Sequence, residues 1–339
     1  MTKVAINGLG RIGRAIFKII LNMRELELVA INDLVPPDNL AYLLKYDTVY
    51  GKYEKQVESN SDNLVVDGKT YRIFNEKQPN NLPWGELGVD IVFECTGIFR
   101  KQEDLEKHLK AGAKKVILSA PAKSEEINTI VYGVNETPES DQIISCASCT
   151  TNCITPVVEV MGRRIGVKKA IMTTVHAYTG SQELVDGPNK KFTRGRAAAA
   201  NIVPTTTGAA IATTQVLTQY SGKFDGVAVR VPVAVGSISD ITFVTERATT
   251  VEEINNIFRE EADSDRYQGV LGVSEDPIVS SDIIQDTRAS IIDLNMTQVV
   301  DGDLVKVMSW YDNEWGYASQ MIREALQMIK TSRTLQPVT

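Results

Sequence analysis

Three of the four cysteines lie in the stretch ISCASCTTNC, as Cys146, Cys149 and Cys153. A C-x-x-C pair supplies half of a zinc site, and the chain has only two histidines to complete it. One of these, His108, lies in a polar helical stretch, which disfavours a zinc site. A thioredoxin-like redox pair is a second interpretation, and a single nucleophilic thiol is the third.

The third interpretation assigns the chemistry to Cys149. The segment IISCAS is typical of a strand ending near Ser148, after which the backbone is expected to turn helical. A thiol at a helix start faces unpaired N–H groups and the helix dipole, which favour thiolate. At an ordinary pKa of about 8.5, only about 3% of a thiol is ionised at pH 7. The segment TTVHAYT places His176 at a strand end, where it is either the activating imidazole or a hydrogen-bonded core histidine.

The other cysteines are expected to be bystanders. Cys95 lies in the apolar run DIVFECTG, and Cys153 follows Cys149 by one helical turn, so both are expected to be small buried hydrophobes. Cys146 should point away from the site, because three residues along an extended strand reverse the face. Four cysteines in a chain this long do not make a disulfide framework, and a reducing compartment would keep them as thiols.

A dinucleotide fingerprint opens the chain. Gly8, Gly10 and Gly13 give G-x-G-x-x-G directly after the apolar segment KVAING, and Asp33 follows Gly13 by twenty residues. Glycines let the backbone approach a pyrophosphate at a helix N-terminus, and the carboxylate can accept hydrogen bonds from ribose hydroxyls. A carboxylate would repel a 2′-phosphate, so NAD is favoured over NADP. The alternative is a plain tight turn.

The elements around this fingerprint predict a doubly wound α/β domain. KVAING, GRIGRAIFKIILNMREL and ELVAIND read as a strand, a helix and a second strand. Two further apolar runs, DIVFECTG and KKVILSA, flank the helix-like KQEDLEKHLKAG and extend the alternation of a mostly parallel sheet. This Rossmann-like texture continues to about residue 148.

After Cys149 the pattern becomes rich in strands. KKAIMTTVHAY, DGVAVRVPV, SISDITFVTE, RASIIDLNM and DLVKVMSWY predict an α+β domain with a mainly antiparallel sheet. Thr250 and Glu253 are spaced as a helix capping box, and the last helix is expected near WGYASQMIREALQMIK. Residues 178–201 have little apolar periodicity, which is typical of a functional or disordered loop.

The bulk properties exclude several classes of protein. A net charge of −7 and a pI near 5.2 argue against non-specific binding to nucleic acid or to anionic membranes. No run approaches the roughly 18 apolar residues of a membrane span, and the opening MTKVAINGLGRIG is unlike a secretory signal. We therefore expect a soluble, cytoplasmic, two-domain protein.

A thiolate used with NAD indicates aldehyde oxidation through a thioester, which water or phosphate then cleaves. Hydroxyls, a glycine N–H and arginines form typical phosphate cradles. The candidates in this chain are Ser148, Thr150, Thr179, Arg194, Thr207, Gly208 and Arg230. Arg230 is notable because it interrupts an apolar strand. The alternative is that PTTTGAA only starts a helix and that the arginines are surface charges.

Several motifs, in order over nearly the whole chain, resemble the glyceraldehyde-3-phosphate dehydrogenase family. They are INGLGRIGR, ASCTTNC, TTVHAYT, VDGPNKK, RGRAAA, PTTTGAA, RVPV and WYDNEWGY. The resemblance implies a phosphorylating, NAD-dependent enzyme of glycolysis and gluconeogenesis that acts on glyceraldehyde 3-phosphate as a homotetramer. It implies a domain of residues 1–148 for NAD, a catalytic domain of residues 149–312, and a helix in 313–339 that packs back on the first domain.

Matching motifs also imply roles for single residues. Cys149 would be the nucleophile and His176 the base and oxyanion partner. NAD would contact Arg11, Ile12, Asp33, Lys77, Ser119 and Asn313 besides the fingerprint glycines. The seven candidate phosphate residues would hold two phosphate positions, and no metal is implied.

The chain departs from the family pattern at a few positions. Gly180 and Ser181 stand where Asn-Asp is common, which removes an acidic group near the substrate phosphate. Cys146 replaces a common asparagine, and Lys77 a common arginine. Gly187 and the proline after it resemble the NAD-using loop. The alternatives are erythrose-4-phosphate dehydrogenase, whose thioester goes to water, and a redox-regulated binding protein on the same fold.

Overall fold

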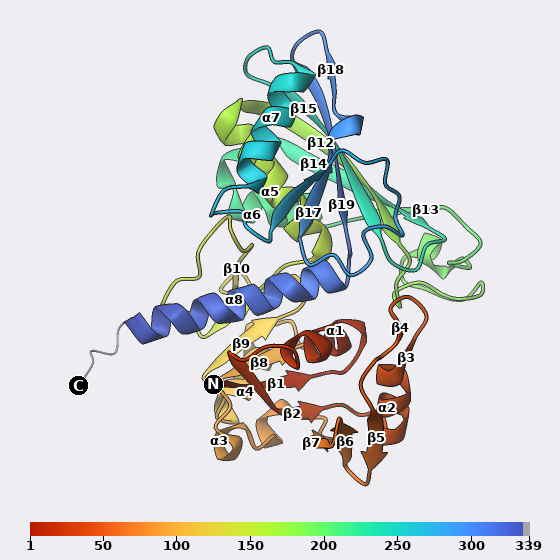
Figure 1. The fold of residues 1–339 in the computed structure, drawn as a ribbon, viewed down its shortest axis with the longest axis vertical. Helices are drawn as coiled ribbons and strands as arrows, with labels where there is room; N and C mark the ends of the chain where they lie inside the picture. Colours follow the sequence, from red (N-terminus) through yellow and green to blue (C-terminus); the bar gives the residue numbers. More distant parts are fainter. Residues whose placement is uncertain (335–339) are drawn as a thin grey trace. The chain divides into compact units, whose positions relative to one another are not determined.

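The computed structural model describes residues 1–334 and divides the chain into two compact units. Unit 1 contains Met1–Ile130, Glu136–Ala147 and the chain from Met321 onward. Unit 2 contains Val131–Asn135 and Ser148–Gln320. Each unit is built around its own sheet (Figure 1).

Unit 1 has a mainly parallel sheet in the order β10-β11-β9-β8-β1-β2-β7-β6-β5. Pairing is parallel from β10 to β7, and β7, β6 and β5 pair antiparallel. The strands are β1 (Thr2–Asn7), β2 (Leu26–Asn32), β5 (Val57–Asn60), β6 (Asn63–Val66), β7 (Lys69–Phe74), β8 (Ile91–Glu94), β9 (Lys115–Leu118), β10 (Asn128–Thr129) and β11 (Ile143–Ser145). A small separate pair is formed by β3 (Tyr46–Asp47) and β4 (Gly51–Lys52).

Helices cover both faces of this sheet. Ile6 of β1 faces α1: a Cβ built on Gly13, which belongs to α1, would lie 3.3 Å from the side chain of Ile6. The next position back, Ala5, points to the other face and packs with Trp84. The helices of unit 1 are α1 (Arg11–Ile20), α2 (Pro37–Lys45), η1 (Pro79–Asn81), α3 (Trp84–Leu87) and α4 (Gln102–Lys110), with the part of α8 (Trp315–Thr334) from Met321. Burial on both faces explains why β1 and β8 are continuous apolar runs.

Unit 2 has an eight-stranded, mainly antiparallel sheet in the order β13-β14-β12-β15-β19-β17-β16, with β18 beside β19. Only the β12–β14 and β16–β17 pairs are parallel. Its strands are β12 (Val167–Ala177), β13 (Val203–Thr206), β14 (Phe224–Val231), β15 (Ser237–Thr245), β16 (Leu271–Ser274), β17 (Ser290–Asp293), β18 (Gln298–Val300) and β19 (Leu304–Tyr311). The predicted fold class, a Rossmann-like domain plus a mainly antiparallel α+β domain, is confirmed.

One face of the second sheet packs on helices. The helices are α5 (Cys149–Arg164), α6 (Ala209–Val216) and α7 (Val251–Ala262), with short turns η2 (Phe192–Gly195), η3 (Thr218–Tyr220) and η4 (Leu294–Met296). Apolar side chains of the three helices form one core with alternate residues of the strands, and the burial of β15 alternates accordingly. Figure 1 shows α5, α6 and α7 grouped beside this sheet. Thr250 caps α7 by accepting a hydrogen bond from the Glu253 N–H.

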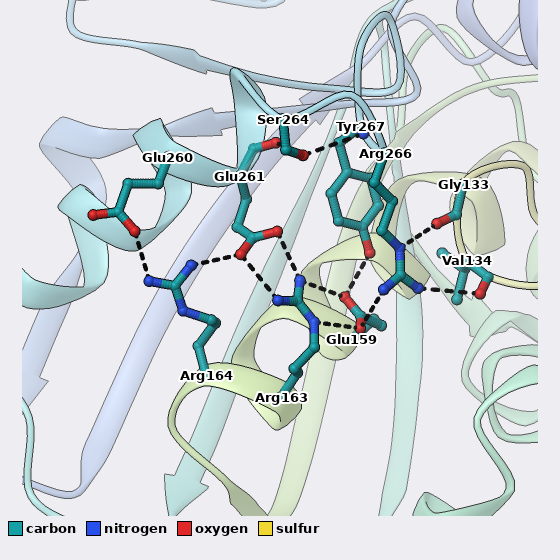
Figure 2. Close-up of polar contacts among 10 residues, drawn as sticks. All are labelled: Gly133, Val134, Glu159, Arg163, Arg164, Glu260, Glu261, Ser264, Arg266 and Tyr267. Atoms are coloured by element: carbon teal, nitrogen blue, oxygen red, sulfur yellow. Dashed lines mark hydrogen bonds and ion pairs between the residues drawn. The ribbon is translucent and has the colours of Figure 1, made fainter.

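A network of ion pairs holds the C-terminal end of α5 (Figure 2). Arg163 contacts Glu159 at 2.8 Å and Glu261 at 2.7 Å, and Arg164 contacts Glu260 and Glu261, both at 2.6 Å. The buried hydroxyl of Tyr267 donates to Glu159, and Arg266 adds an ion pair to the same carboxylate. We call these seven residues the α5 anchor network. They join α5 to α7 and to the turn after α7.

The loop at 178–201 is folded. Backbone hydrogen bonds join Glu183 to the Arg194 and Ala198 peptides and Gly187 to Gly195. The loop therefore closes on itself and holds Arg194 in a defined place. Within residues 1–334, no helix combines the length and the apolar character that a bilayer crossing requires.

Candidate active site

Cys149 is the first residue of α5, and Ser148 is the N-cap. The Ser148 hydroxyl accepts a hydrogen bond from the Thr151 N–H at 3.1 Å, which fixes the start of the helix. Cys149 Sγ lies 3.4 Å from His176 Nε2. The structure thus brings together the thiol and the imidazole that sequence analysis singled out, and both belong to unit 2.

Two groups contact Nδ1 of His176, the ring nitrogen that faces away from the thiol. Its Nδ1 lies 2.6 Å from the Ala177 carbonyl oxygen and 2.7 Å from a guanidinium nitrogen of Arg230. The same Arg230 nitrogen donates to the Ala177 oxygen at 2.8 Å, so it does not need Nδ1 of His176 as a hydrogen-bond acceptor. With the proton on Nδ1 donated to Ala177, Nε2 carries the lone pair that faces the thiol. That is the tautomer required of a base.

Sheet register explains why Arg230 meets His176. The strands β12 and β14 are parallel, and His176 is directly opposite Arg230. The interruption of the apolar strand by an arginine therefore has a structural reason. The guanidinium contributes the positive charge beside the thiol–imidazole pair.

Burial keeps this pair uncharged. It lowers the pKa of His176 to about 3, and the charge of Arg230 acts in the same direction. Burial also raises the pKa of Cys149, although Arg230 and the N–H groups of Thr150 and Cys149 oppose the rise. The thiol and the imidazole are therefore both neutral in this state. An anion paired with Arg230 would remove the field that disfavours the imidazolium.

A second arginine lies in the loop at 178–201. Arg194 donates from Nε to Thr205 Oγ1 at 3.1 Å and from a terminal nitrogen to Ser181 Oγ at 3.2 Å. Ser181 Oγ is in turn 2.9 Å from Thr179 Oγ1. Burial lowers the pKa of Arg194, and the nearby charge of Arg230 lowers it further. Hydroxyls and cations thus gather on one side of the catalytic pair.

Sequence analysis missed Lys191 in this group. Its Nζ donates to Thr206 Oγ1 at 2.6 Å. Burial lowers its pKa, and the charges of Arg194 and Arg230 add to the effect. The only signal was the proximity of a lysine to Arg194 in NKKFTRG. Among the described residues, the side chains that contact Lys191, Arg194 and Arg230 include no carboxylate, so the three cations form an anion-attracting cluster.

The remaining phosphate candidates have structural partners as well. Thr207 Oγ1 accepts from the Ala209 N–H at 3.2 Å, and Gly208 is the N-cap of α6, so PTTTGAA does start a helix. Open space surrounds Gly208 where a Cβ would lie. Thr150 is buried and shares a hydrogen bond of 2.9 Å with the Tyr311 hydroxyl. The two readings of TTTG, helix start and anion cradle, are compatible.

Tyr311 was also missed. Its hydroxyl bonds both Thr150 and Thr174, and its ring meets the His176 ring edge-on at 5.9 Å. Burial raises its pKa, so the hydroxyl remains neutral. The residue could have been suspected only from its place in the WYDNEW motif. It packs directly beneath the catalytic pair.

The other cysteines are unreactive by environment. Burial raises the pKa of Cys153 to about 12, and its sulfur lies 3.4 Å from Ser309 Oγ. Burial also raises the pKa values of Cys95 and Cys146, both in unit 1. Cys146 is buried, but the prediction that Cys95 is a buried hydrophobe is wrong, because its position just after β8 leaves it partly exposed. All four cysteines are free thiols. His108, considered as a zinc ligand, is instead buried in unit 1 against Trp84.

The fingerprint glycines of unit 1 form a tight cradle. Gly8 has a φ of +95°, and a Cβ on Gly13 would lie 2.0 Å from the Gly8 carbonyl oxygen. No side chain caps α1 at Gly10, and no heavy atom lies within 4 Å of a Cβ built there. Asp33 follows β2 and accepts from the Leu9 N–H at 2.6 Å. These residues fit a dinucleotide pyrophosphate and an adjoining ribose.

The other cofactor candidates are divided between the units. Ile12 lies in the first turn of α1, and Arg11 forms an ion pair with Asp47, so its guanidinium is already engaged. Lys77 follows β7 and Ser119 follows β9 at the carboxyl ends of their strands. Asn313 belongs to unit 2, where its Oδ1 accepts from Gly236 N–H and Ser237 Oγ.

A dinucleotide cradle on a Rossmann-like sheet and a thiol–imidazole pair beside arginines define an NAD-dependent oxidoreductase. Residues 2–102 match the family model described as the glyceraldehyde 3-phosphate dehydrogenase NAD binding domain. Residues 148–313 match the model of the C-terminal domain of the same family. The chain belongs to the glyceraldehyde-3-phosphate dehydrogenase family, and the predicted cofactor, NAD, is confirmed.

Curated relatives agree over almost the full length. The glyceraldehyde-3-phosphate dehydrogenase of Thermotoga maritima is 51% identical over 327 residues, covering 95% of this chain and 97% of the relative. Those of Streptomyces coelicolor and Geobacillus stearothermophilus are each 50% identical and cover 94% of this chain and 96% of the relative. The resemblance inferred from the motifs is therefore confirmed.

Proposed function

We propose that this chain catalyses the NAD-dependent oxidation of glyceraldehyde 3-phosphate coupled to uptake of inorganic phosphate, which gives 1,3-bisphosphoglycerate. The observation that carries the proposal is the contact of 3.4 Å between Cys149 Sγ and His176 Nε2 beside Arg230 and Arg194. Family membership supports the substrate, and the arginines support recognition of anions.

The first step is addition of the Cys149 sulfur to the aldehyde carbon. The thiol proton moves to His176 Nε2 and from there to the aldehyde oxygen, giving a hemithioacetal with a hydroxyl group. The phosphate of the substrate is expected to pair with Arg230. Burial is the largest cause of the lowered pKa of His176, and the pairing would offset the further lowering by the charge of Arg230, so substrate binding would make His176 a stronger base.

The second step is oxidation of the hemithioacetal. Bound NAD supplies the acceptor for the hydride that leaves the substrate carbon. His176 takes the hydroxyl proton as the carbon–oxygen double bond forms, which leaves a thioester on Cys149. The Ala177 carbonyl holds the ring in place through Nδ1–H during this transfer.

The third step is attack on the thioester carbon by an oxygen of inorganic phosphate. The Cys149 backbone N–H and the protonated His176 would stabilise the tetrahedral oxyanion. The carbon–sulfur bond then breaks, and the sulfur leaves as thiolate. Ser148, Thr150, Thr179, Arg194, Thr207 and Gly208 are proposed to hold the two phosphate positions with Arg230. Ser181 joins this group through Thr179 and Arg194 and supplies a neutral hydroxyl where an acidic group is common.

The cofactor contacts, the domain boundaries and the assembly are part of the same proposal. Gly8, Gly10, Arg11, Ile12, Gly13, Asp33, Lys77, Ser119 and Asn313 would contact NAD. The boundaries remain 1–148, 149–312 and 313–339. A homotetramer is supported by the outer face of the second sheet, where Ile171 of β12 and Val227 of β14 are more than half exposed. Four free thiols support a cytoplasmic location.

The test is NADH formation from glyceraldehyde 3-phosphate with and without inorganic phosphate, with erythrose 4-phosphate run in parallel. Turnover that requires phosphate and prefers the three-carbon substrate is the expected result. Phosphate-independent turnover that is faster on the four-carbon sugar would show that water is the acceptor. A folded chain that oxidises neither aldehyde would leave the redox-regulated binding protein as the better account.

A further inference from the structure

A row of buried polar side chains crosses unit 1 beneath the cofactor cradle. Glu94, Asn7 and Asn32 are the last residues of β8, β1 and β2, which are neighbours in the sheet (Figure 1). Asn7 is in register with both of the others, and all three are at most 5% exposed. The catalytic steps use none of them. They lie at the carboxyl ends of parallel strands, the edge at which such sheets bind nucleotides.

One side of this row begins at Trp84. The indole N–H can only donate, and it donates to His108 Nδ1 at 3.0 Å. His108 must therefore carry its proton on Nε2, which lies 3.1 Å from Glu94 Oε2. Trp84 and His108 are both fully buried. From this side, hydrogen bonds are donated toward Glu94.

The other side begins at the backbone of Glu76. Its N–H donates to Asn32 Oδ1 and its carbonyl accepts from Asn32 Nδ2, both at 2.9 Å, so the Asn32 amide has a fixed orientation. Asn32 Nδ2 also donates to Asn7 Oδ1 at 2.7 Å, which turns the Asn7 amide nitrogen toward Glu94 Oε2. From this side too, hydrogen bonds are donated toward Glu94.

Thr96 adds two more donors to the same carboxylate. Its N–H lies 2.8 Å from Glu94 Oε1, and its hydroxyl bonds the same oxygen. The Thr96 hydroxyl also accepts from the Ile98 N–H at 3.1 Å. Thr96 packs so closely on Gly8 that a Cβ there would lie 2.8 Å from the Thr96 nitrogen. The position of Glu94 thus determines how closely the loop after β8 approaches the fingerprint loop.

We propose that Glu94 is a positioning residue for NAD, through which a polarised relay from Trp84 and from the Glu76 peptide sets the loops of the cofactor cradle. Asn7 directly precedes Gly8, Asn32 precedes Asp33, and Glu76 precedes Lys77, while Thr96 bonds Glu94 itself. The relay therefore fixes the chain at four points of the cofactor cradle. Only a group with two acceptor oxygens and no hydrogen satisfies donors arriving from every side. This inference rests on the proposed function, since it concerns the affinity of that site for NAD.

The discriminating substitution is Glu94→Gln, which keeps the shape and replaces one acceptor by a donor. If the new NH₂ faces Thr96, the Thr96 N–H loses its acceptor. If the new NH₂ faces Asn7 and His108, it meets two donors that cannot become acceptors. The Asn7 amide is held by Asn32, which the Glu76 peptide orients, and the His108 tautomer is held by the Trp84 indole. Either way a loop of the cradle shifts, and we expect the Kd for NAD to rise by about 10-fold or more, or about 1.4 kcal/mol.

The measurement is calorimetric titration of NAD into the full-length protein, with KM for NAD and kcat at saturating NAD. A raised Kd and KM with kcat within about two-fold indicates positioning. Glu106→Gln on α4 is the matched control, because its half-exposed carboxylate has no part in the relay and its Kd should be unchanged. A Glu94→Gln protein that melts at a lower temperature but binds NAD with wild-type Kd would overturn the proposal.

Thr96→Val provides a second route if Glu94→Gln does not fold. It removes one donor to Glu94 and the acceptor for the Ile98 N–H while keeping the shape of the side chain. The Kd for NAD should rise several-fold, while KM for the aldehyde stays constant. An unchanged Kd would contradict the relay. Wild-type protein that binds no NAD would refute the proposed function itself, along with any positioning role.

Discussion

The two ends of α5 are built on opposite electrostatic principles. At its start, the partly exposed Cys149 and the buried His176 form a neutral pair, and Arg230 supplies a charge with no carboxylate beside the ring. At its end, the α5 anchor network pairs three arginines with three glutamates (Figure 2). The first end has an unbalanced charge that a substrate anion can complete. The second end is balanced within the chain.

This difference shows how a reactive group is held in place. Burial alone would raise the pKa of Glu261, but contacts with Arg163 and Arg164 hold it below its usual value. The same arginines have raised pKa values because of their glutamate partners. Glu261, Arg163 and Arg164 therefore stay charged at neutral pH and fix one end of the helix. The proposed chemistry takes place at the other end, where the charge state can change.

The largest expected effect is that of Cys149→Ser. A hydroxyl is a far weaker nucleophile than a thiolate, so NADH formation should fall by at least about 10³-fold while NAD binding is retained. Steady-state assays and NAD titration measure the two properties. Cys153→Ser is the control, because that sulfur already lies among serine hydroxyls and takes no part in the reaction. More than trace activity in Cys149→Ser would contradict the assignment of the nucleophile.

The next effect is that of His176→Asn. Loss of the base should lower kcat by about 10²- to 10⁴-fold. It should also raise the pKa of the Cys149 thiol, because no imidazole then accepts the thiol proton. The rate of alkylation by iodoacetamide as a function of pH should have its midpoint at higher pH than in the wild type. An unmoved profile would show that His176 does not activate the thiol.

Arg230→Leu sharpens the comparison by removing the unbalanced charge. With phosphorylated substrate, kcat/KM should fall by about 10²-fold, because a charged contact to the phosphate is lost. With unphosphorylated glyceraldehyde, the change should be much smaller. Arg259→Leu, which removes an exposed arginine of α7, serves as the control. An equal loss on both aldehydes would assign Arg230 to the chemistry and not to phosphate recognition.

Glu261→Gln breaks the balanced end and should leave catalysis almost intact. Glu261 is 7% exposed and contacts two half-exposed arginines, so about 1–3 kcal/mol of unfolding free energy should be lost, with kcat within about two-fold of wild type. Denaturant unfolding measures the loss. Glu260→Gln, at an exposed position of the same network, should cost less.

The same carboxylate gives a pH dependence. Because the pKa of folded Glu261 is lowered, its contribution to stability is complete above the unfolded-state pKa near 4.5. The contribution disappears as the pH falls through the folded-state pKa. Wild type and Glu261→Gln should therefore differ most in stability at neutral pH and converge in acid. Curves that stay parallel down to acid would contradict the ionic origin of the effect.

Sequence analysis predicted the features that local patterns determine. The glycine fingerprint, Asp33 and the thiol at a helix start depend on a few adjacent residues. The change from a parallel to an antiparallel sheet follows from the order of the elements, since strands and helices alternate before Cys149 and strands predominate after it. The contact of His176 with Arg230 could not be predicted, since it depends on the register of β12 against β14. Lys191 and Tyr311 were missed for the same reason: their neighbours come from distant segments.

His108 shows where a pattern misleads. Its helix is polar in sequence, and the residue was judged only as a possible metal ligand. In the fold it is fully buried between Trp84 and Glu94, on the one face of α4 that packs inward with Leu105. Trp84 and Glu94 are 24 and 14 residues away from His108, so no helical or strand periodicity connects them to it. The contacts of such a histidine can be recognised only once the fold brings α3, α4 and β8 together.

The parallel pairing of β12 with β14 also has a consequence for folding. Parallel neighbours need a crossover, and here the chain must pass through the loop at 178–201, β13 and α6 before β14 can pair. Cys149 lies on a helix whose turns form locally, whereas His176 and Arg230 meet only after the long segment between their strands has folded. During refolding, enzymatic activity should therefore return later than the helical circular-dichroism signal. The rate at which activity returns would then report when β12 and β14 pair.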